Sequence, residues 1–217
     1  MDENRSLSKW LQRLLIVSII SITYGVLTHT VNFGGYNEWI KLLINAGFLF
    51  CMCKLGQYHG VYRVPAIFLS IKMICTFVRL IWSSNAVHPL IRDLLDENYI
   101  EVLTSVSTWT VWILLICDIA VLLLEPNAHS KMIKSVDLRL SKYWRWITVA
   151  TLVVSMGMFY LNVFIPDMLR LGTLDVELYQ QIQPFLNLPG MLVRIAYIVC
   201  LFTTVRVMEG NCHGKEE

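Results

Sequence analysis

Six long apolar runs are the feature of this sequence that most restricts its fold. They cover residues 14–31, 39–55, 65–82, 102–124, 147–165 and 189–207. A helix needs roughly 20 mostly apolar residues to cross the hydrocarbon core of a bilayer, and the runs come close to that length. Because 56% of the residues are hydrophobic and only 16% are charged, a water-soluble domain is excluded. The sequence predicts an all-α, polytopic membrane protein with a bundle of six transmembrane helices.

The six runs use most of the 217 residues and leave no soluble domain of useful size. We therefore expect one integral membrane domain over residues 1–217. Arg5, Lys9 and Arg13 precede the first run, a pattern that also opens secretory signal peptides. The run is longer than a signal h-region of about 7–15 residues, so we interpret it as the first span.

The distribution of Lys and Arg predicts the orientation of the chain. Twelve of the 18 basic residues fall on one side of the six spans: Arg5, Lys9, Arg13, Lys54, Arg63, Lys131, Lys134, Arg139, Lys142, Arg145, Arg206 and Lys215. By the positive-inside rule this side is the cytoplasm. We expect a multi-pass cell-membrane protein with both termini cytoplasmic.

The cytoplasmic segment Ser130–Trp146 mixes basic with apolar residues. This composition predicts an amphipathic helix lying on the anionic inner leaflet. A nucleic-acid partner is not expected, because a short basic loop beside a span is usually a topology signal.

The prolines lie between or at the ends of the predicted spans. We expect Pro126 and Pro166 to close spans. No proline interrupts a span, which argues against the broken helices of many transporters. The cysteines fall in spans or in the cytoplasm, and an outer-loop disulfide is therefore not expected.

Two oppositely charged residues lie at matching depths in consecutive spans. At 1.5 Å per residue, Lys72 is about 10 Å from the inner end of the third span, and Asp118 is about 9 Å from that of the fourth. Ionisable side chains inside a membrane pair with one another, so we expect an ion pair between them. The pair has either a structural role or a role in proton or ion coupling.

Two arginines lie on the outer side, Arg79 about 5 Å and Arg194 about 8 Å below the interface. Their planar guanidinium groups suit bidentate binding of a carboxylate or phosphate. Alternatively, they extend to the outer surface or pair with loop acids. Polar residues in the outer halves of the spans complete a predicted cavity: Thr28, His29, Asn32, Asn45, Ser105, Thr108, Asn162 and Tyr197.

Enzyme chemistry has little support in the sequence. Cys53 and His59 share the inner end of the second span, which would permit a membrane cysteine protease, but their spacing does not orient a base. The histidines lack metal-ligand or haem spacing, and the common catalytic motifs are missing. No cofactor and no metal are expected.

Three hypotheses follow. The first is capture or transport of a small anionic or polar solute in a cavity open to the outer side. The second is a sensor, immunity or assembly subunit that binds a peptide or another membrane protein. A membrane-embedded enzyme is the third and the least supported by the sequence.

Overall fold

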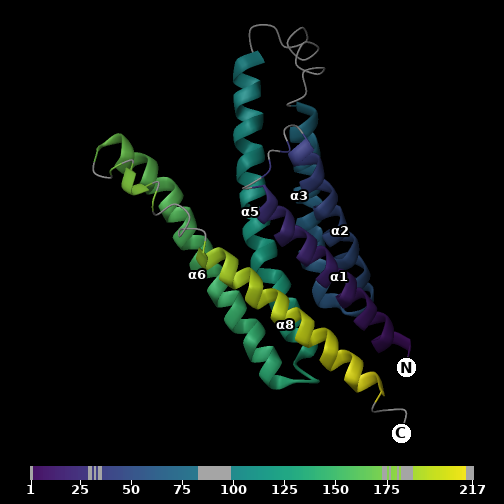
Figure 1. The fold of residues 1–217 in the computed structure, drawn as a ribbon. Coiled ribbons are helices and arrows are strands. Elements are labelled where there is room, and N and C mark those ends of the chain that lie inside the picture. Colours follow the sequence, from purple (N-terminus) through teal and green to yellow (C-terminus); the bar gives the residue numbers. More distant parts are fainter. Residues whose placement is uncertain are drawn as a thin grey trace. The chain divides into compact units, whose positions relative to one another are not determined.

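The chain folds into helices. The computed structural model describes residues 2–28, 31, 33, 36–82, 99–172, 175, 177–179, 181 and 188–213. The elements are α1 (Asp2–Leu27), α2 (Tyr36–Tyr58), the short 3₁₀ helix η1 (Gly60–Tyr62), α3 (Arg63–Trp82), α5 (Tyr99–Ile133), α6 (Leu138–Arg170) and α8 (Leu188–His213) (Figure 1). The described residues contain no strand, and the predicted all-α class is confirmed.

Six of these helices are long and apolar enough to cross a membrane. Each overlaps one of the apolar runs, so the prediction of six helices long and apolar enough to span a membrane is confirmed. A membrane selects helices because lipid offers no hydrogen bonds, and a helix pairs its N–H and C=O groups internally. The side of the membrane on which each terminus lies stays a prediction.

Two prolines lie where the sequence predicted helix ends, and that prediction is wrong. Pro126 lies inside α5 and Pro166 lies inside α6. A proline removes one backbone hydrogen bond, but membrane helices tolerate this loss because neighbouring groups or local adjustments compensate. The helices therefore continue past the apolar runs that define the predicted spans.

The predicted amphipathic helix over Ser130–Trp146 is also wrong, because the helical path breaks at residues 134–137. The backbone N–H of Leu140 donates to the Asp137 carboxylate at 2.9 Å. This is an N-cap, in which a side-chain oxygen satisfies an amide that has no partner within the helix. Asp137 thus starts α6 only a few residues after α5 ends.

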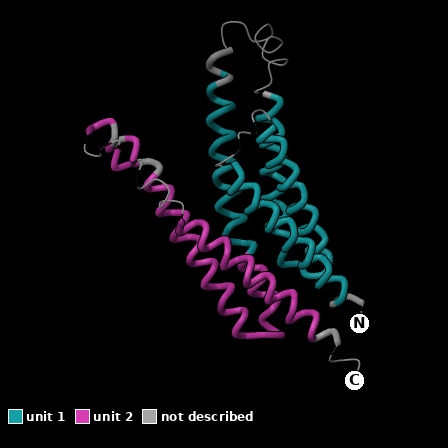
Figure 2. The backbone as a smooth tube through the Cα atoms, viewed as in Figure 1, with its two compact units in different colours: residues 1–125 teal, residues 126–217 magenta. Residues whose placement is uncertain are grey.

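The contacts divide the chain into two compact units, Met1–Glu125 (unit 1) and Pro126–Glu217 (unit 2) (Figure 2). In unit 1, α1 packs on α2 and α2 packs on α3. Buried residues recur at helical spacing on α1, as Leu7, Leu11 and Leu14. This division is based on contacts between residues and does not test whether residues 1–217 form one integral membrane domain. That expectation stays a prediction.

A glycine permits the close approach of α1 and α2. A Cβ atom added at Gly47 would lie 3.3 Å from a methyl carbon of Val17. Small residues at helix contacts let membrane helices pack closely, where dispersion replaces the hydrophobic effect. Near the C-terminal end of α2, the Arg63 Nε donates to the Gly56 carbonyl at 3.3 Å, joining the start of α3 to α2.

Unit 2 is held together by buried polar contacts. The Trp144 Nε1–H on α6 donates to the Thr204 hydroxyl on α8 at 2.9 Å, and both side chains are fully buried. Ser130 and Ser141 exchange hydroxyl-to-carbonyl hydrogen bonds of 3.0 and 2.9 Å between α5 and α6. These bonds satisfy polar groups that would be costly to leave unpaired in an apolar interior.

Candidate functional site

Unit 1 contains an open cavity of about 450 Å³ that is lined by residues of α1, α2, α3 and α5. This volume lies within the range of small-molecule sites. Its lining consists of Ser21, Tyr24, Glu38, Lys41, Ile44, Asn45, Lys72, Thr76, Arg79, Val111, Leu114, Leu115 and Asp118. The lining residues recur at intervals of three, four or seven along each helix, so one face of each helix is turned toward the cavity.

The helices that line the cavity place its residues in successive layers. Tyr24 near the end of α1 contacts Asn37 at the start of α2, and Lys72 on α3 contacts Asp118 on α5. α3 and α5 run in opposite directions (Figure 1). Arg79, seven residues after Lys72 on α3, therefore lies at about the same level as Val111, seven residues before Asp118 on α5. The separation of these two levels is about 10 Å.

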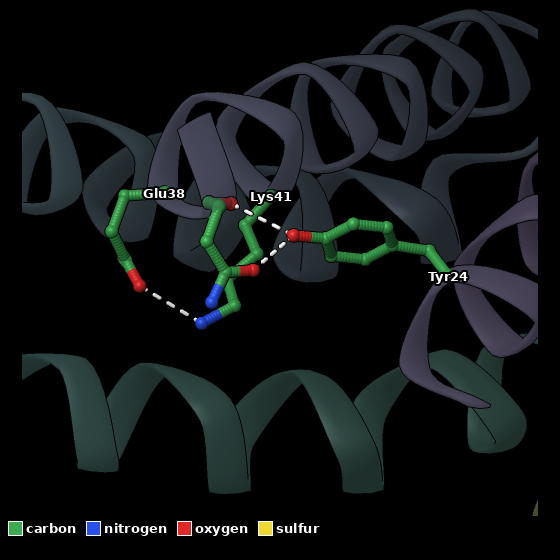
Figure 3. A network of polar contacts seen from close by, with 4 residues as sticks. Tyr24, Glu38 and Lys41 are labelled. Carbon is green, nitrogen blue, oxygen red and sulfur yellow. Dashed lines mark hydrogen bonds and ion pairs between the residues drawn. The ribbon is translucent and has the colours of Figure 1, made fainter. Parts of the chain in front are cut away.

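The upper layer lies where α1 ends and α2 begins, and it carries several charges. The Tyr24 hydroxyl donates to the Asn37 carbonyl oxygen at 3.1 Å and also contacts the Asn37 side-chain oxygen. One turn along α2, the Lys41 Nζ lies 2.8 Å from the Glu38 carboxylate (Figure 3). Lys41 therefore already has a counter-ion on its own helix.

Arg79 is the remaining cation of the upper layer. Its side chain lines the cavity from α3, one turn before the helix ends at Trp82. Among the described residues, no carboxylate lies within 4.0 Å of its guanidinium nitrogens. The side chain is exposed, so its donors are accessible to a molecule in the cavity.

The middle layer combines apolar and neutral polar side chains. Leu114 and Leu115 of α5 and Ile44 of α2 are its apolar members. Asn45 and Thr76 add an amide and a hydroxyl, and the Thr76 hydroxyl donates to the Lys72 carbonyl at 2.8 Å. In the part of the chain that the structure describes, no hydrogen bond engages the Asn45 amide, whose donors and acceptor are therefore open to a bound molecule.

The lower layer is an ion pair between α3 and α5. The Lys72 Nζ lies 2.5 Å from an Asp118 carboxylate oxygen. The structure thus contains the pair that matching depths predicted. The contact makes this layer electrically neutral and ties α5 to α3, whereas its role in ion coupling stays a prediction.

The structure places only part of the predicted binding set around this cavity. Arg79 and Asn45 line it. Arg194 belongs to unit 2, so the predicted convergence of the two arginines stays a prediction. Thr108 is exposed on α5 and its hydroxyl donates to the Thr104 carbonyl at 2.8 Å.

The other predicted positions lie elsewhere or outside the description. Tyr197 in unit 2 has its hydroxyl 3.5 Å from the His129 Nε2, and its ring centroid is 5.3 Å from that of Trp144. His29 and the side chain of Asn162 lie outside the described residues. The ligand-binding roles of these residues stay predictions.

Several lining residues were not predicted. Glu38 and Lys41 were not assigned to the cavity, because hydropathy places charged residues near a helix end at the interface. Tyr24 also lines the cavity and was not assigned to it. The i, i+3 and i+7 spacing of Glu38, Lys41 and Asn45 is the signal that would have placed them on one face.

The pair proposed for enzyme chemistry gains no support. Cys53 is exposed, and the His59 ring lies edge-on to Tyr62 at 6.5 Å. Between Cys53 and His59 no hydrogen bond forms within the described chain. Nucleophilic catalysis requires a base within hydrogen-bond reach of the thiol.

Comparison of the chain with protein-family models, curated proteins and solved structures gives no match. Function is therefore inferred from the physical properties of the unit 1 cavity. The relevant features are its volume, its layered lining and, among the described residues, the balance of three cationic side chains against two carboxylates.

Proposed function

We propose that this multi-pass membrane protein captures or transports a small anionic or polar solute in the cavity of unit 1. The proposal rests on which of the three cationic side chains in the lining have a carboxylate partner. Lys41 is paired with Glu38 and Lys72 with Asp118, whereas Arg79 has no carboxylate partner among the described residues. Arg79 therefore carries the positive charge of the lining that is not balanced by a carboxylate, and arginine is well suited to bind an anion.

The chemistry of arginine supports this role. Its guanidinium remains charged in proteins and offers donors in a planar fork that matches a carboxylate or phosphate. An ionisable group within a membrane helix is costly unless it is paired or hydrated, and it commonly marks a ligand or ion pathway. A bound anion would supply the counter-charge that Arg79 lacks among the described residues.

The distribution of basic residues supports an orientation. If the side rich in Lys and Arg is the cytoplasm, both termini are cytoplasmic in the cell membrane. The upper layer then faces outward, since α1 runs from the cytoplasm and ends beside it. We infer that the cavity receives its solute from the outer side.

Native mass spectrometry of the protein released from mild detergent tests this function. We expect a small bound mass on the wild-type protein and its loss from Arg79→Gln. Arg170→Gln is the matched control, because Arg170 is an exposed arginine at the end of α6 and does not line the cavity. Loss of the bound mass from both variants, or from neither, would contradict the proposal.

The same spectrum separates the alternatives. A bound protein chain with no small ligand would favour a sensor, immunity or assembly subunit. In that case, Arg79 would have a surface role such as contact with headgroups or loop acids.

A further inference from the structure

We infer that the ligand is an organic monocarboxylate with a short apolar chain, its carboxylate bound to Arg79 and its chain directed toward the lower layer. This inference rests on the proposed function and narrows its ligand class. It follows from the order of the three layers, in which a layer of apolar and neutral polar side chains lies between two charged layers.

The charge balance of the cavity specifies a single negative charge. Among the described residues, three cations and two carboxylates line it, and both carboxylates are already in contact with a lysine. A monoanion at Arg79 therefore neutralises the lining. A second negative charge on the ligand would have to compete with Glu38 for Lys41 or with Asp118 for Lys72, and both of these contacts are already formed, at 2.8 and 2.5 Å.

The middle layer specifies the body of the ligand. Ile44, Leu114 and Leu115 form an apolar wall in the middle layer, which also carries the Asn45 amide and the Thr76 hydroxyl. An inorganic anion would leave this wall in contact with water, whereas an alkyl chain would bury it. Each buried methylene group contributes about 0.8 kcal/mol, which corresponds to about a fourfold gain in affinity.

The lower layer limits the length of the chain. Lys72 and Asp118 lie about 10 Å along the cavity from Arg79, at 1.5 Å per residue. An apolar chain end that reached this pair would remove water from two charges without replacing its hydrogen bonds, which is unfavourable. The volume of about 450 Å³ equals roughly 15 water molecules at about 30 Å³ each, which also indicates a small molecule.

A chain-length series tests the inference on the full-length protein in lipid nanodiscs. The probes are acetate, butyrate, hexanoate, octanoate and decanoate, with the alcohol and the amine of each chain as charge controls. Calorimetric titration gives the Kd of each probe. We expect the affinity for the carboxylates to rise about fourfold per methylene and to stop rising when the chain reaches the depth of Lys72.

The Arg79 variants locate the carboxylate. Arg79→Gln is expected to weaken hexanoate binding at least tenfold and to leave binding of hexan-1-ol unchanged, whereas Arg170→Gln leaves both unchanged. The alcohol serves as the folding control, since a misfolded variant would lose both ligands. Equal binding of the acid and the alcohol by the wild-type protein would overturn the inference without any variant.

Other outcomes also overturn it. An affinity that keeps rising through decanoate would indicate a fatty acid entering from the bilayer. Arg79-dependent binding of inorganic phosphate, sulfate or a dicarboxylate, with no binding of the monocarboxylates, would refute the inference and leave the proposed function standing. If no small molecule binds in an Arg79-dependent manner, both proposals fail.

Discussion

The ammonium group of Lys72 lies 2.5 Å from the carboxylate of Asp118 and joins α3 to α5 at the lower layer of the unit 1 cavity. The two residues are far apart in the sequence and belong to two separate helices of unit 1. The pair forms the lower layer of the cavity lining and has no net charge. The inferred limit on the chain length of the ligand depends on its position.

Removing one partner of this pair is expected to destabilise the protein. Asp118→Asn retains the shape of the side chain but leaves the Lys72 ammonium without its counter-ion. Breaking a fully buried pair costs about 3–5 kcal/mol. Because 47% of the Asp118 side chain is exposed, we expect a smaller loss of about 1–2 kcal/mol in the free energy of unfolding.

Reversible unfolding in detergent measures this loss, and Lys41→Gln is the control. That variant breaks an exposed pair spaced i, i+3 on one helix, which is worth about 0.2–0.5 kcal/mol. The double variant Lys72→Met/Asp118→Leu removes both charges and is expected to recover most of the stability. If Asp118→Asn and Lys41→Gln lowered the free energy of unfolding equally, the Lys72–Asp118 pair would not have the expected contribution to stability.

The packing of α1 on α2 depends on the absence of a side chain at Gly47. Gly47→Leu places atoms where even a Cβ would lie 3.3 Å from Val17, so we expect a loss of about 1–3 kcal/mol from overpacking. Gly157→Leu is the matched control, since no atom lies within 4 Å of a Cβ added there. Thermal unfolding compares the two variants, and Val17→Ala should partly rescue the first. A larger effect at Gly157 would refute this account of the contact.

The hydrogen bond between Trp144 and Thr204 is expected to stabilise unit 2. Trp144→Phe removes the indole N–H and leaves a buried hydroxyl with one partner fewer, at a cost of about 1–3 kcal/mol. Trp146→Phe makes the same substitution two residues away, where the indole is 71% exposed. Thermal unfolding should show a clearly lower midpoint only for Trp144→Phe, and equal midpoints would remove this bond from the stabilising contacts.

The start of α6 depends on the carboxylate of Asp137. Asp137→Ala deprives the Leu140 N–H of its acceptor and is expected to cost about 1 kcal/mol. Asp137→Asn retains a side-chain oxygen that caps helices about equally well, so it should remain close to the wild type. Chemical unfolding would distinguish them. Similar losses in both variants would indicate that the charge, not the cap, is responsible.

The six helices long and apolar enough to cross a membrane, and one polar contact between them, were predictable from local sequence properties. An apolar run long enough to cross a bilayer identifies a span without knowledge of its neighbours. The pairing of Lys72 with Asp118 was predictable because two opposite charges at matching depths in consecutive spans have few other partners. Asn45 and Arg79 were assigned to a binding site because they are polar residues within apolar helices.

Helix ends were less predictable, because hydropathy measures lipid compatibility and not helical hydrogen bonding. Pro126 and Pro166 interrupt neither α5 nor α6, although both lie beyond the apolar runs. The start of α6 depends instead on a single hydrogen bond to Asp137. Such a cap is a local contact whose formation the hydropathy pattern does not report.

The sequence by itself determined the class of the protein, since the transfer of apolar residues into lipid depends on composition and length alone. Only the tertiary structure decided which polar faces meet. It placed Tyr24, Glu38 and Lys41 around the same cavity as Arg79, and it placed Tyr197 against His129 and Trp144. The physical reason is that helical periodicity defines a face on each helix, whereas the choice of facing partner depends on side-chain packing between helices.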